Sequence, residues 1–370
     1  MSILQKIKNF LKRFLPPPTR TFLRETDSLR RQIETLSRRL DEETRANALA
    51  QQQLVQMAQQ QMQTAQQQMQ TAQQQLLRGR EQSDEQLAAL LQNNSNQLQR
   101  LQRGLFRTAP QPRLSYFVLN ILDHCNLRCR GCDHFAAIAE KRFVALEDIS
   151  ADLQKMSALT EGRVTRIGVM GGEPLLHPQL KEILAEARRN FPDTLIQVVS
   201  NGLLMNQQAD TFWEACRDNR IEIVVTKYPI ELDFEKMEET AQKWGVAFRY
   251  YGDTGEVIKT SYKMSIDVAG RQDPTESFWD CYHANQLPLL MEGKFYPCTV
   301  APNVRHFNKK FGTNMALEAG DYLELDKVSS ADELYQFLCT PKPFCRYCKT
   351  KERTFGHPWG RSEQKMEEWI

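Results

Sequence analysis

Residues 114–132 read LSYFVLNILDHCNLRCRGC, an apolar run that is followed at once by three cysteines. The apolar residues predict a strand over 114–122, and the cysteines follow its carboxyl end with the spacing C-x3-C-x2-C. In barrel-like parallel sheets, active-site loops leave from the carboxyl ends of the strands. The stretch therefore predicts a parallel sheet that presents three thiols on one loop.

Cys125, Cys129 and Cys132 supply three metal ligands, and a tetrahedral zinc site needs a fourth. The nearest candidates for that ligand are the polar residues beside the cysteines: Asp123, His124, Asp133 and His134. Alternatively, the thiols could bind three irons of a four-iron cluster and leave the fourth iron open, because simple ferredoxin loops use other spacings. The spacing by itself leaves both centres open.

Strand-like and helical patterns alternate downstream of the cysteines, which predicts a parallel sheet with right-handed crossovers. We expect strands over 114–122, 163–170, 194–200, 221–225, 246–251 and 264–268. We expect helices over 145–159, 179–191, 209–219 and 233–245. Six strands are too few for a closed eight-unit barrel. The predicted fold class is α/β, a partial (β/α)6 TIM-like barrel.

Two further polar turns follow strands of this sheet. GGEP at 171–174 follows the second strand, and SNG at 200–202 follows the third. Gly171 and Gly172 allow the backbone to come close to a ligand, and Glu173 can accept hydrogen bonds from an ammonium group. Ser200 and Asn201 can hydrogen-bond hydroxyl or carboxylate groups. The three turns should gather at one edge of the sheet.

The C-x3-C-x2-C loop followed by GGEP resembles the radical S-adenosylmethionine (SAM) enzymes over roughly residues 115–255. The resemblance implies a [4Fe-4S] cluster on Cys125, Cys129 and Cys132, with SAM on its open iron. It also implies SAM contacts from Gly171, Gly172, Glu173, Ser200 and Asn201. The family usually has an aromatic residue before the third cysteine, whereas this chain has Gly131.

A second cysteine set follows in the C-terminal part of the chain. Cys281-x11-Gly293-x4-Cys298 is followed by the pair Cys345-x2-Cys348, and four such thiols suit either zinc or a closed [4Fe-4S] cluster. The pattern resembles the SPASM and twitch extensions of radical SAM enzymes, which implies one auxiliary cluster. Cys339 is spare, and we interpret it as a thiol at a helix end.

The N-terminal third has two zones of different composition. Residues 1–18 carry apolar and basic side chains at helical spacing, which predicts a helix on a membrane surface or docked on its own protein. Residues 19–108 are rich in Gln, and their apolar residues are spaced alternately three and four positions apart, which predicts a homo-oligomeric coiled coil. A disordered Gln-rich spacer is the alternative. The predicted domains are 1–18, 19–108, 113–268 and 269–370.

The composition favours a reducing compartment. The chain has 370 residues, nine cysteines and a formal net charge of +2. We see no secretory signal, so clustered cysteines favour metal binding over disulfides. We therefore expect a cytoplasmic protein, which would be peripheral on the inner face of the membrane if residues 1–18 bind a membrane surface. Basic residues are mixed with acidic ones, so we expect no nucleic-acid partner.

The resemblance implies that SAM is cleaved reductively to a 5′-deoxyadenosyl radical, with electrons from a flavodoxin- or ferredoxin-type donor. We expect a sugar-like or polyol substrate undergoing oxidation, epimerisation or rearrangement. The overall layout is similar to proteins from polysaccharide gene clusters. There are two alternatives: an enzyme that modifies a peptide or protein, and a membrane-tethered scaffold that holds the clusters without turnover. Lys227, after the fourth strand, is a weak candidate for a catalytic base.

Overall fold

The structure is a computed structural model that describes residues 6, 9, 17–76, 84–108, 113–251 and 259–370. The chain divides into two compact units, Met1–Leu101 and Gln102–Ile370. The predicted basic helix at 1–18 lies almost entirely outside the described residues. In the described part of the chain, no helix combines the length and the apolar character that a bilayer crossing requires.

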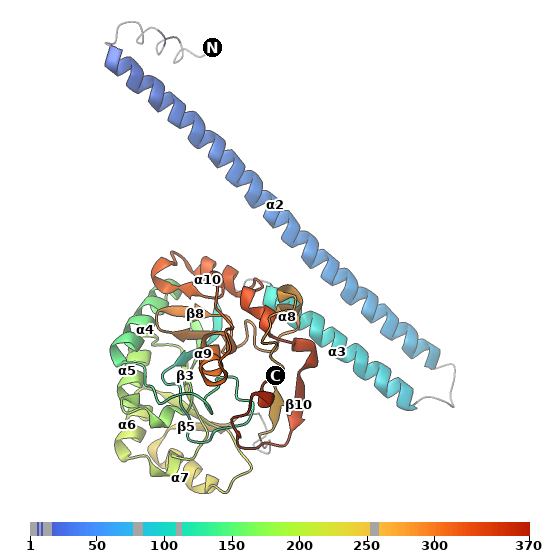
Figure 1. The fold of residues 1–370 in the computed structure, drawn as a ribbon, viewed down its shortest axis with the longest axis vertical. Helices are drawn as coiled ribbons and strands as arrows, with labels where there is room; N and C mark the ends of the chain where they lie inside the picture. Colours follow the sequence, from blue (N-terminus) through green and yellow to red (C-terminus); the bar gives the residue numbers. More distant parts are fainter. Residues whose placement is uncertain (1–5, 7–8, 10–16, 77–83, 109–112, 252–258) are drawn as a thin grey trace. The chain divides into compact units, whose positions relative to one another are not determined.

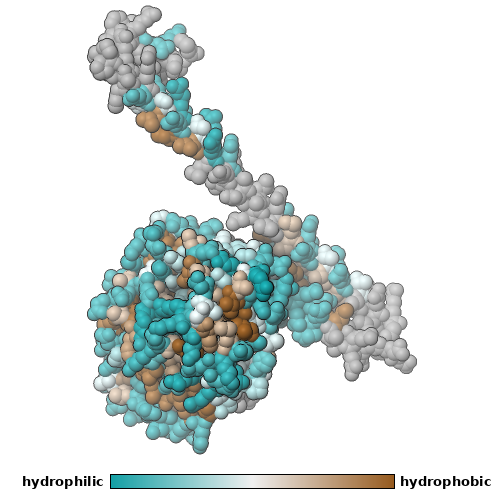
Figure 2. Space-filling model, in the orientation of Figure 1, coloured by the Kyte–Doolittle hydropathy of each residue, from teal (hydrophilic) through white to brown (hydrophobic). Residues whose placement is uncertain are grey.

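The first unit contains a long helix, α2 (Pro17–Leu76), and the beginning of α3 (Asp84–Thr108). At 1.5 Å per residue, the 60 residues of α2 extend over about 90 Å. Apolar side chains are exposed on the first part of α2, where Leu29, Ile33 and Leu36 are 58%, 65% and 64% accessible (Figure 2). The long helix was expected, while its pairing with a second copy stays a prediction.

The second unit is built on an eight-stranded sheet with the order β5-β4-β3-β2-β1-β7-β8-β9. Its strands are β1 (Leu114–Asn120), β2 (Val164–Met170), β3 (Leu195–Ser200), β4 (Ile221–Val225), β5 (Ala247–Tyr250), β7 (Leu289–Met291), β8 (Lys294–Tyr296) and β9 (Leu323–Glu324). β1 to β5 and β7 run parallel, whereas β8 pairs antiparallel with β7 and β9 pairs antiparallel with β8. The α/β class with a mostly parallel sheet is therefore confirmed.

Helices follow the strands of this sheet along one side (Figure 1). They are α4 (Leu146–Thr160), α5 (Leu180–Asn190), α6 (Asp210–Asp218) and α7 (Phe234–Trp244). Their apolar faces pack against the sheet in one large core that includes Phe117, Phe191 and Trp213. Three further helices belong to the C-terminal part: α8 (Pro274–Asp280), α9 (Val300–Phe311) and α10 (Ala331–Leu338).

The prediction of a sixth strand at 264–268 is wrong. Ser265 has a φ of 56°, which interrupts extended backbone, and Ile266 forms only an isolated bridge with Cys348. The sixth parallel strand is β7, which joins the sheet on the far side of β1. A small second sheet pairs β6 (Ser261–Lys263) with β10 (Thr354–His357). Residues from the C-terminal zone thus complete the core sheet.

A second apolar core surrounds the end of the chain. Trp369 is fully buried there, together with Phe135, Met264 and Phe307. Phe135 lies three residues beyond the last cysteine of the first loop, and its ring centroid is 5.9 Å from that of Trp369. This core joins the C-terminus to the segment that follows the cysteine loop.

Candidate active site

The first three cysteines lie together on the loop that follows β1. Burial raises the pKa of the Cys125 thiol to about 11, with further contributions from the charges of Glu173 and Cys129. Burial also raises the pKa of Cys132, as do the charges of Asp133, Cys129 and Cys125. The three thiols are therefore close neighbours, and they carry protons at pH 7 until a metal displaces them.

The GGEP turn packs directly on this cysteine loop. A Cβ on Gly172 would lie 1.8 Å from the carbonyl oxygen of His124, and a Cβ on Gly171 would lie 2.2 Å from that of Leu122. Gly172 N and Glu173 N instead donate to Leu122 and His124 oxygens, both at 3.1 Å. The approach of these glycines to a ligand stays a prediction, and in the structure they allow the close approach of the cysteine loop.

Glu173 joins the second turn to the third. Its carboxylate accepts hydrogen bonds from Ser200 Oγ at 2.8 Å, Asn201 N at 2.8 Å and Leu175 N at 3.1 Å. Burial raises its pKa to about 7, and these three bonds act in the opposite direction. Asn201 Nδ2 in turn donates to Asn126 Oδ1 at 2.8 Å and lies 3.5 Å from Cys125 Sγ. The three predicted turns thus meet at one edge of the sheet.

Two aromatic residues that the sequence analysis did not assign to the site flank Cys129. The rings of Tyr228 and Trp359 meet edge to face, with centroids 5.5 Å apart. Burial raises the pKa of the Cys129 thiol, and the neighbouring Trp359 and Tyr228 side chains oppose that rise. Nothing local in the sequence connects residue 359 with residue 129.

Lys227 has a different set of neighbours. Its Nζ lies 3.8 Å from the ring centroid of Tyr250 and 5.3 Å from that of Phe234. These rings belong to β5 and α7, so the ammonium group is engaged by a cation–π contact on that side of the sheet. This contact gives no support to Lys227 as a catalytic base.

The second set of cysteines also converges. Burial raises the pKa of Cys345 well above its ordinary value, as do the charges of Cys348, Cys281 and Cys298 in that order. Cys281 and Cys345 pack in one small cluster with Phe278 and Ala284. The segments that carry these thiols are the end of α8, the end of β8 and a 3₁₀ helix at Pro343–Tyr347.

Arg353 lies beside two of these thiols, Cys281 and Cys348, and was not anticipated. Its Nη1 is 3.5 Å from Cys281 Sγ, and its Nε donates to the Met264 carbonyl oxygen at 3.3 Å. Nη2 is buried and has no hydrogen-bond partner among the described residues. Burial acts to raise the pKa of Cys281, but the Arg353 charge and two backbone N–H groups bring it below its ordinary value.

Cys339 is placed apart from this set. It caps α10, and burial raises its pKa to about 11 while the charge of Lys342 opposes that rise. It lines a small cavity with residues of β1 and α10.

Among the residues that the structure describes, no three His, Cys, Asp or Glu side chains converge closely enough to hold a single metal ion.

Side chains that follow cysteines of both sets meet between them. Asp133, next to Cys132, accepts a hydrogen bond at 2.9 Å from Oγ1 of Thr299, which follows Cys298. Nε2 of His283, two residues after Cys281, lies 3.6 Å from the same carboxylate. The two sets of cysteines are therefore held in neighbouring parts of one compact unit.

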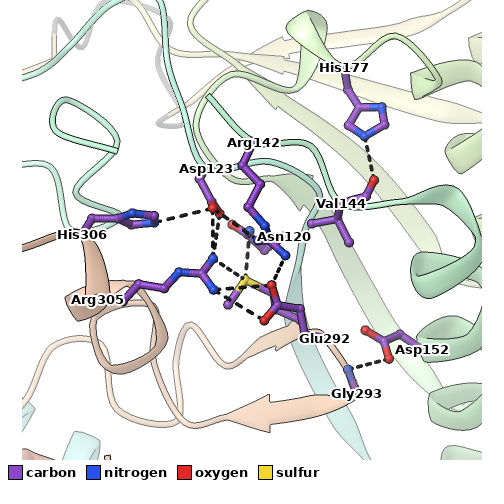
Figure 3. Close-up of polar contacts among 11 residues, drawn as sticks. Asn120, Asp123, Arg142, Val144, Asp152, His177, Glu292, Gly293, Arg305 and His306 are labelled. Atoms are coloured by element: carbon purple, nitrogen blue, oxygen red, sulfur yellow. Dashed lines mark hydrogen bonds and ion pairs between the residues drawn. The ribbon is translucent and has the colours of Figure 1, made fainter. Parts of the chain in front are cut away.

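A charged network fixes the beginning of the first cysteine loop (Figure 3). The buried carboxylate of Asp123 pairs with Arg305 at 3.0 Å and with Arg142 at 3.3 Å. Glu292, in the turn between β7 and β8, pairs with both arginines. Burial lowers the pKa of the neighbouring His306 to about 4, although Asp123 acts to raise it. The network balances two arginines with two carboxylates and ties α9 to β1.

A pocket opens beside the first loop. It has a volume of about 220 Å³, and its lining includes His124, Cys125, Arg128, Lys141 and Gln364. Cys125 therefore lies next to open space on one side and next to Asn201 on the other. This arrangement leaves room for a small ligand near a metal bound to the loop.

Comparisons with known proteins agree with this geometry. Residues 119–243 match the family model described as the radical SAM superfamily. A GTP 3′,8-cyclase of Trichodesmium erythraeum is 31% identical over 107 residues, which are 28% of this chain and 32% of that relative. One of Chlorobaculum tepidum is 31% identical over 106 residues, or 28% of this chain and 31% of the relative. The chain thus spans about a third of the length of these curated relatives.

Among solved structures, BtrN in complex with AdoMet and 2-DOIA has 16% sequence identity and a TM-score of 0.42, over 64% of this chain and 93% of that chain. Native anSMEcpe with bound AdoMet and Cp18Cys peptide has 18% identity and a TM-score of 0.30, over 38% of this chain and 42% of that chain. The family match places the likeness to the radical SAM superfamily in residues 119–243, the segment that carries the first cysteine loop and the GGEP and SNG turns.

Proposed function

We propose that this protein is a radical SAM enzyme that binds a [4Fe-4S] cluster through Cys125, Cys129 and Cys132. The observation that carries the proposal is the meeting of these three thiols with the GGEP turn at the carboxyl edge of β1 and β2. The thiols fit such a cluster because they are close neighbours, and in the described part of the chain no group of His, Cys, Asp or Glu side chains forms a site for a single metal ion.

When bound, the cluster would supply the electron that breaks a sulfur–carbon bond of SAM, giving methionine and a 5′-deoxyadenosyl radical that takes a hydrogen atom from the substrate. The protein residues hold and orient the reactants. Glu173 fixes the second and third turns against the cysteine loop through Ser200 and Asn201. Gly171 and Gly172 keep that packing close. The pocket beside Cys125 offers space for a ligand of this loop.

We further propose that Cys281, Cys298, Cys345 and Cys348 hold a second [4Fe-4S] cluster. Four protein thiols leave no open iron, which suits electron transfer better than binding of substrate. Oxidation of a carbinol to a carbonyl removes one hydrogen atom, one proton and one electron from the substrate. The hydrogen atom goes to the deoxyadenosyl radical, so the electron needs an acceptor nearby. The second set of thiols supports a polyol or sugar-like substrate for this reason.

The curated relatives are named for a reaction of GTP, and their match to this chain covers only the core segment. A nucleotide is therefore a useful comparison substrate, as is a peptide. A flavodoxin- or ferredoxin-type protein would supply electrons. The same proposal includes two associations. The helix α2 would pair with a second copy of the chain, and residues 1–18 would bind an anionic membrane surface.

The test uses protein purified and reconstituted without oxygen. Dithionite-reduced protein is incubated with SAM, and 5′-deoxyadenosine is measured together with iron, sulfide and zinc. We expect iron and sulfide on the first loop and formation of 5′-deoxyadenosine without added substrate. Zinc without iron on this loop, or an absence of 5′-deoxyadenosine from iron-loaded protein, would overturn the proposal. Polyols, GTP and peptides deuterated at carbon are then compared by transfer of deuterium into 5′-deoxyadenosine.

A further inference from the structure

The last residues of the chain run alongside the first cysteine loop. Arg130 N donates to the Gly360 carbonyl oxygen at 2.9 Å, and Ser362 N donates to that of Arg128 at 2.8 Å. Between these two bonds, Cys129 and Arg361 form an isolated antiparallel bridge. The C-terminal strap, which we define as residues 359–369, thus supplies partners to the backbone on both sides of the central cysteine.

A third bond fixes the strap at its far end. Trp369 Nε1 donates to the Cys132 carbonyl oxygen at 3.0 Å, and the Trp369 carbonyl accepts from Ile266 N at 2.7 Å. Because the Trp369 ring is fully buried, this anchor does not depend on solvent-exposed contacts. The strap is therefore tied both to the cysteine loop and to the second apolar core.

The cysteine loop needs such partners because its own backbone is irregular. Arg128 and Gly131 have φ values of 54° and 67°, so the loop forms neither a helix nor a strand through the three cysteines. A Cβ on Gly131 would lie 2.7 Å from the carbonyl oxygen of Tyr262. The loop is therefore pressed against other segments, and its backbone groups at Arg128, Arg130 and Cys132 bond to the strap.

The strap also brings a side chain to the sulfur of Cys129. The indole Nε1 of Trp359 is buried, it lies beside Cys129, and it has no hydrogen-bond partner among the described residues. The Tyr228 hydroxyl approaches the same thiol from the end of β4. Both groups are donors, and hydrogen bonds to the sulfurs of an iron–sulfur cluster are one of the factors that set its reduction potential.

We propose that the C-terminal strap positions the cluster-binding loop, and that Trp359 is a positioning residue whose indole N–H faces the Cys129 sulfur and raises the reduction potential of the bound cluster. The inference rests on the proposed function, because it requires a cluster on this loop. It assigns a role to residues more than two hundred positions away from the cysteines.

The donor is tested by Trp359→Phe in the reconstituted full-length protein. Trp244→Phe, the same change on α7, is the matched control. We expect Trp359→Phe to keep its iron and to show a reduction potential, measured by EPR-monitored titration, that is more negative than that of wild type and of Trp244→Phe. Tyr228→Phe removes the second donor and should shift the potential in the same direction.

An unchanged potential in iron-loaded Trp359→Phe would overturn the assignment of the indole as a donor. If Trp359→Phe loses its iron, the assignment is judged on Tyr228→Phe, and an unchanged potential there overturns it. A failure of the proposed function is distinguishable, because wild-type protein would then hold no iron on this loop and form no 5′-deoxyadenosine.

The backbone role of the strap is tested by Ser362→Pro against Ser362→Ala. Proline removes the N–H that bonds to Arg128, and the extended bridge at Arg361 is compatible with a following proline. Alanine removes only the hydroxyl, which accepts from Gln364 N at 3.0 Å. We expect a chelator to remove iron about fivefold faster from the proline variant, which corresponds to one net hydrogen bond. Equal rates in the two variants would overturn this role.

Discussion

The two cysteine sets of this protein differ in how the chain builds them. Cys125, Cys129 and Cys132 lie within eight residues on one loop, beside a pocket and two neutral aromatic donors. The other four thiols come from three separate segments, and two of them, Cys281 and Cys348, lie beside the guanidinium group of Arg353. A nearby cation stabilises the more negative, reduced form of a cluster. The contrast favours an open centre that delivers an electron and a closed centre that accepts one.

The largest expected effect comes from removing one set at a time. Cys129→Ala should abolish formation of 5′-deoxyadenosine, because three thiolates are needed to hold the cluster that binds SAM. The double variant Cys345→Ala/Cys348→Ala should keep this activity while iron falls from about eight to about four per chain. Iron and sulfide analysis with product chromatography checks both outcomes. Loss of SAM cleavage in the double variant, with iron kept on the first loop, would contradict the division of roles.

The cation in the second site gives the next largest effect. Arg353→Met removes the charge beside Cys281 and Cys348, so the reduced form of this centre loses stabilisation. We expect a more negative potential and an affinity for the metal centre that is lower by about 10–100-fold, as is usual for residues that support metal ligands. Arg353→Lys is the matched control and should recover part of both.

EPR-monitored titration with the first cluster as internal reference measures this shift. Equal potentials in the Met and Lys variants would mean that the charge of Arg353 has no influence on this centre, and that the contrast between the two sites does not depend on it.

Local patterns predicted the strands, helices and turns around the first set of cysteines, but not the contacts that bring the second set together. β1 to β5 and α4 to α7 lie within two residues of the ranges expected from apolar periodicity, because each such pattern is contained in a single element. The cysteine loop, the GGEP turn and the SNG turn meet as expected, because the carboxyl ends of parallel strands lie at the same edge of a sheet. The elements and turns around the first set of cysteines can therefore be predicted largely from short stretches of sequence.

The remaining features depend on contacts between distant segments. Nothing around Trp369 or Arg353 indicates that they face Cys132 or Cys281, because these pairings arise only when the chain is folded. The sixth strand was misplaced because β7 has three residues, too few to show a period. Glu292 and Gly293 both have positive φ, as in a two-residue hairpin turn. The Glu-Gly pair was therefore the signal in the sequence that could have located β7 and β8.

Glu173 offers a smaller test on the side of the first site. Glu173→Gln replaces one acceptor oxygen by an amide group, which then faces a donor such as Asn201 N or Ser200 Oγ. A buried donor left without an acceptor costs about 1–3 kcal/mol. We expect weaker SAM binding and a lower melting temperature, with iron retained, measured by equilibrium dialysis and anaerobic thermal denaturation. Unchanged SAM binding would show that this carboxylate does not position the site.

The smallest effect concerns the hairpin that leads to Cys298. The buried carboxylate of Asp152, on α4, accepts a hydrogen bond from Gly293 N at 2.8 Å. Burial raises its pKa from 3.8 to about 6, and the Gly293 bond opposes that rise. A carboxyl group with a raised pKa in the folded state contributes stability that is complete below about pH 4 and is lost as the pH rises through about 6.

Asp152→Asn keeps the acceptor and removes this titration. We expect the gain of the variant over wild type to be about 1 kcal/mol larger at pH 8 than at pH 5, which corresponds to about 2–4 °C in melting temperature. A gain at pH 5 as large as at pH 8 would show that charge burial is not the cause.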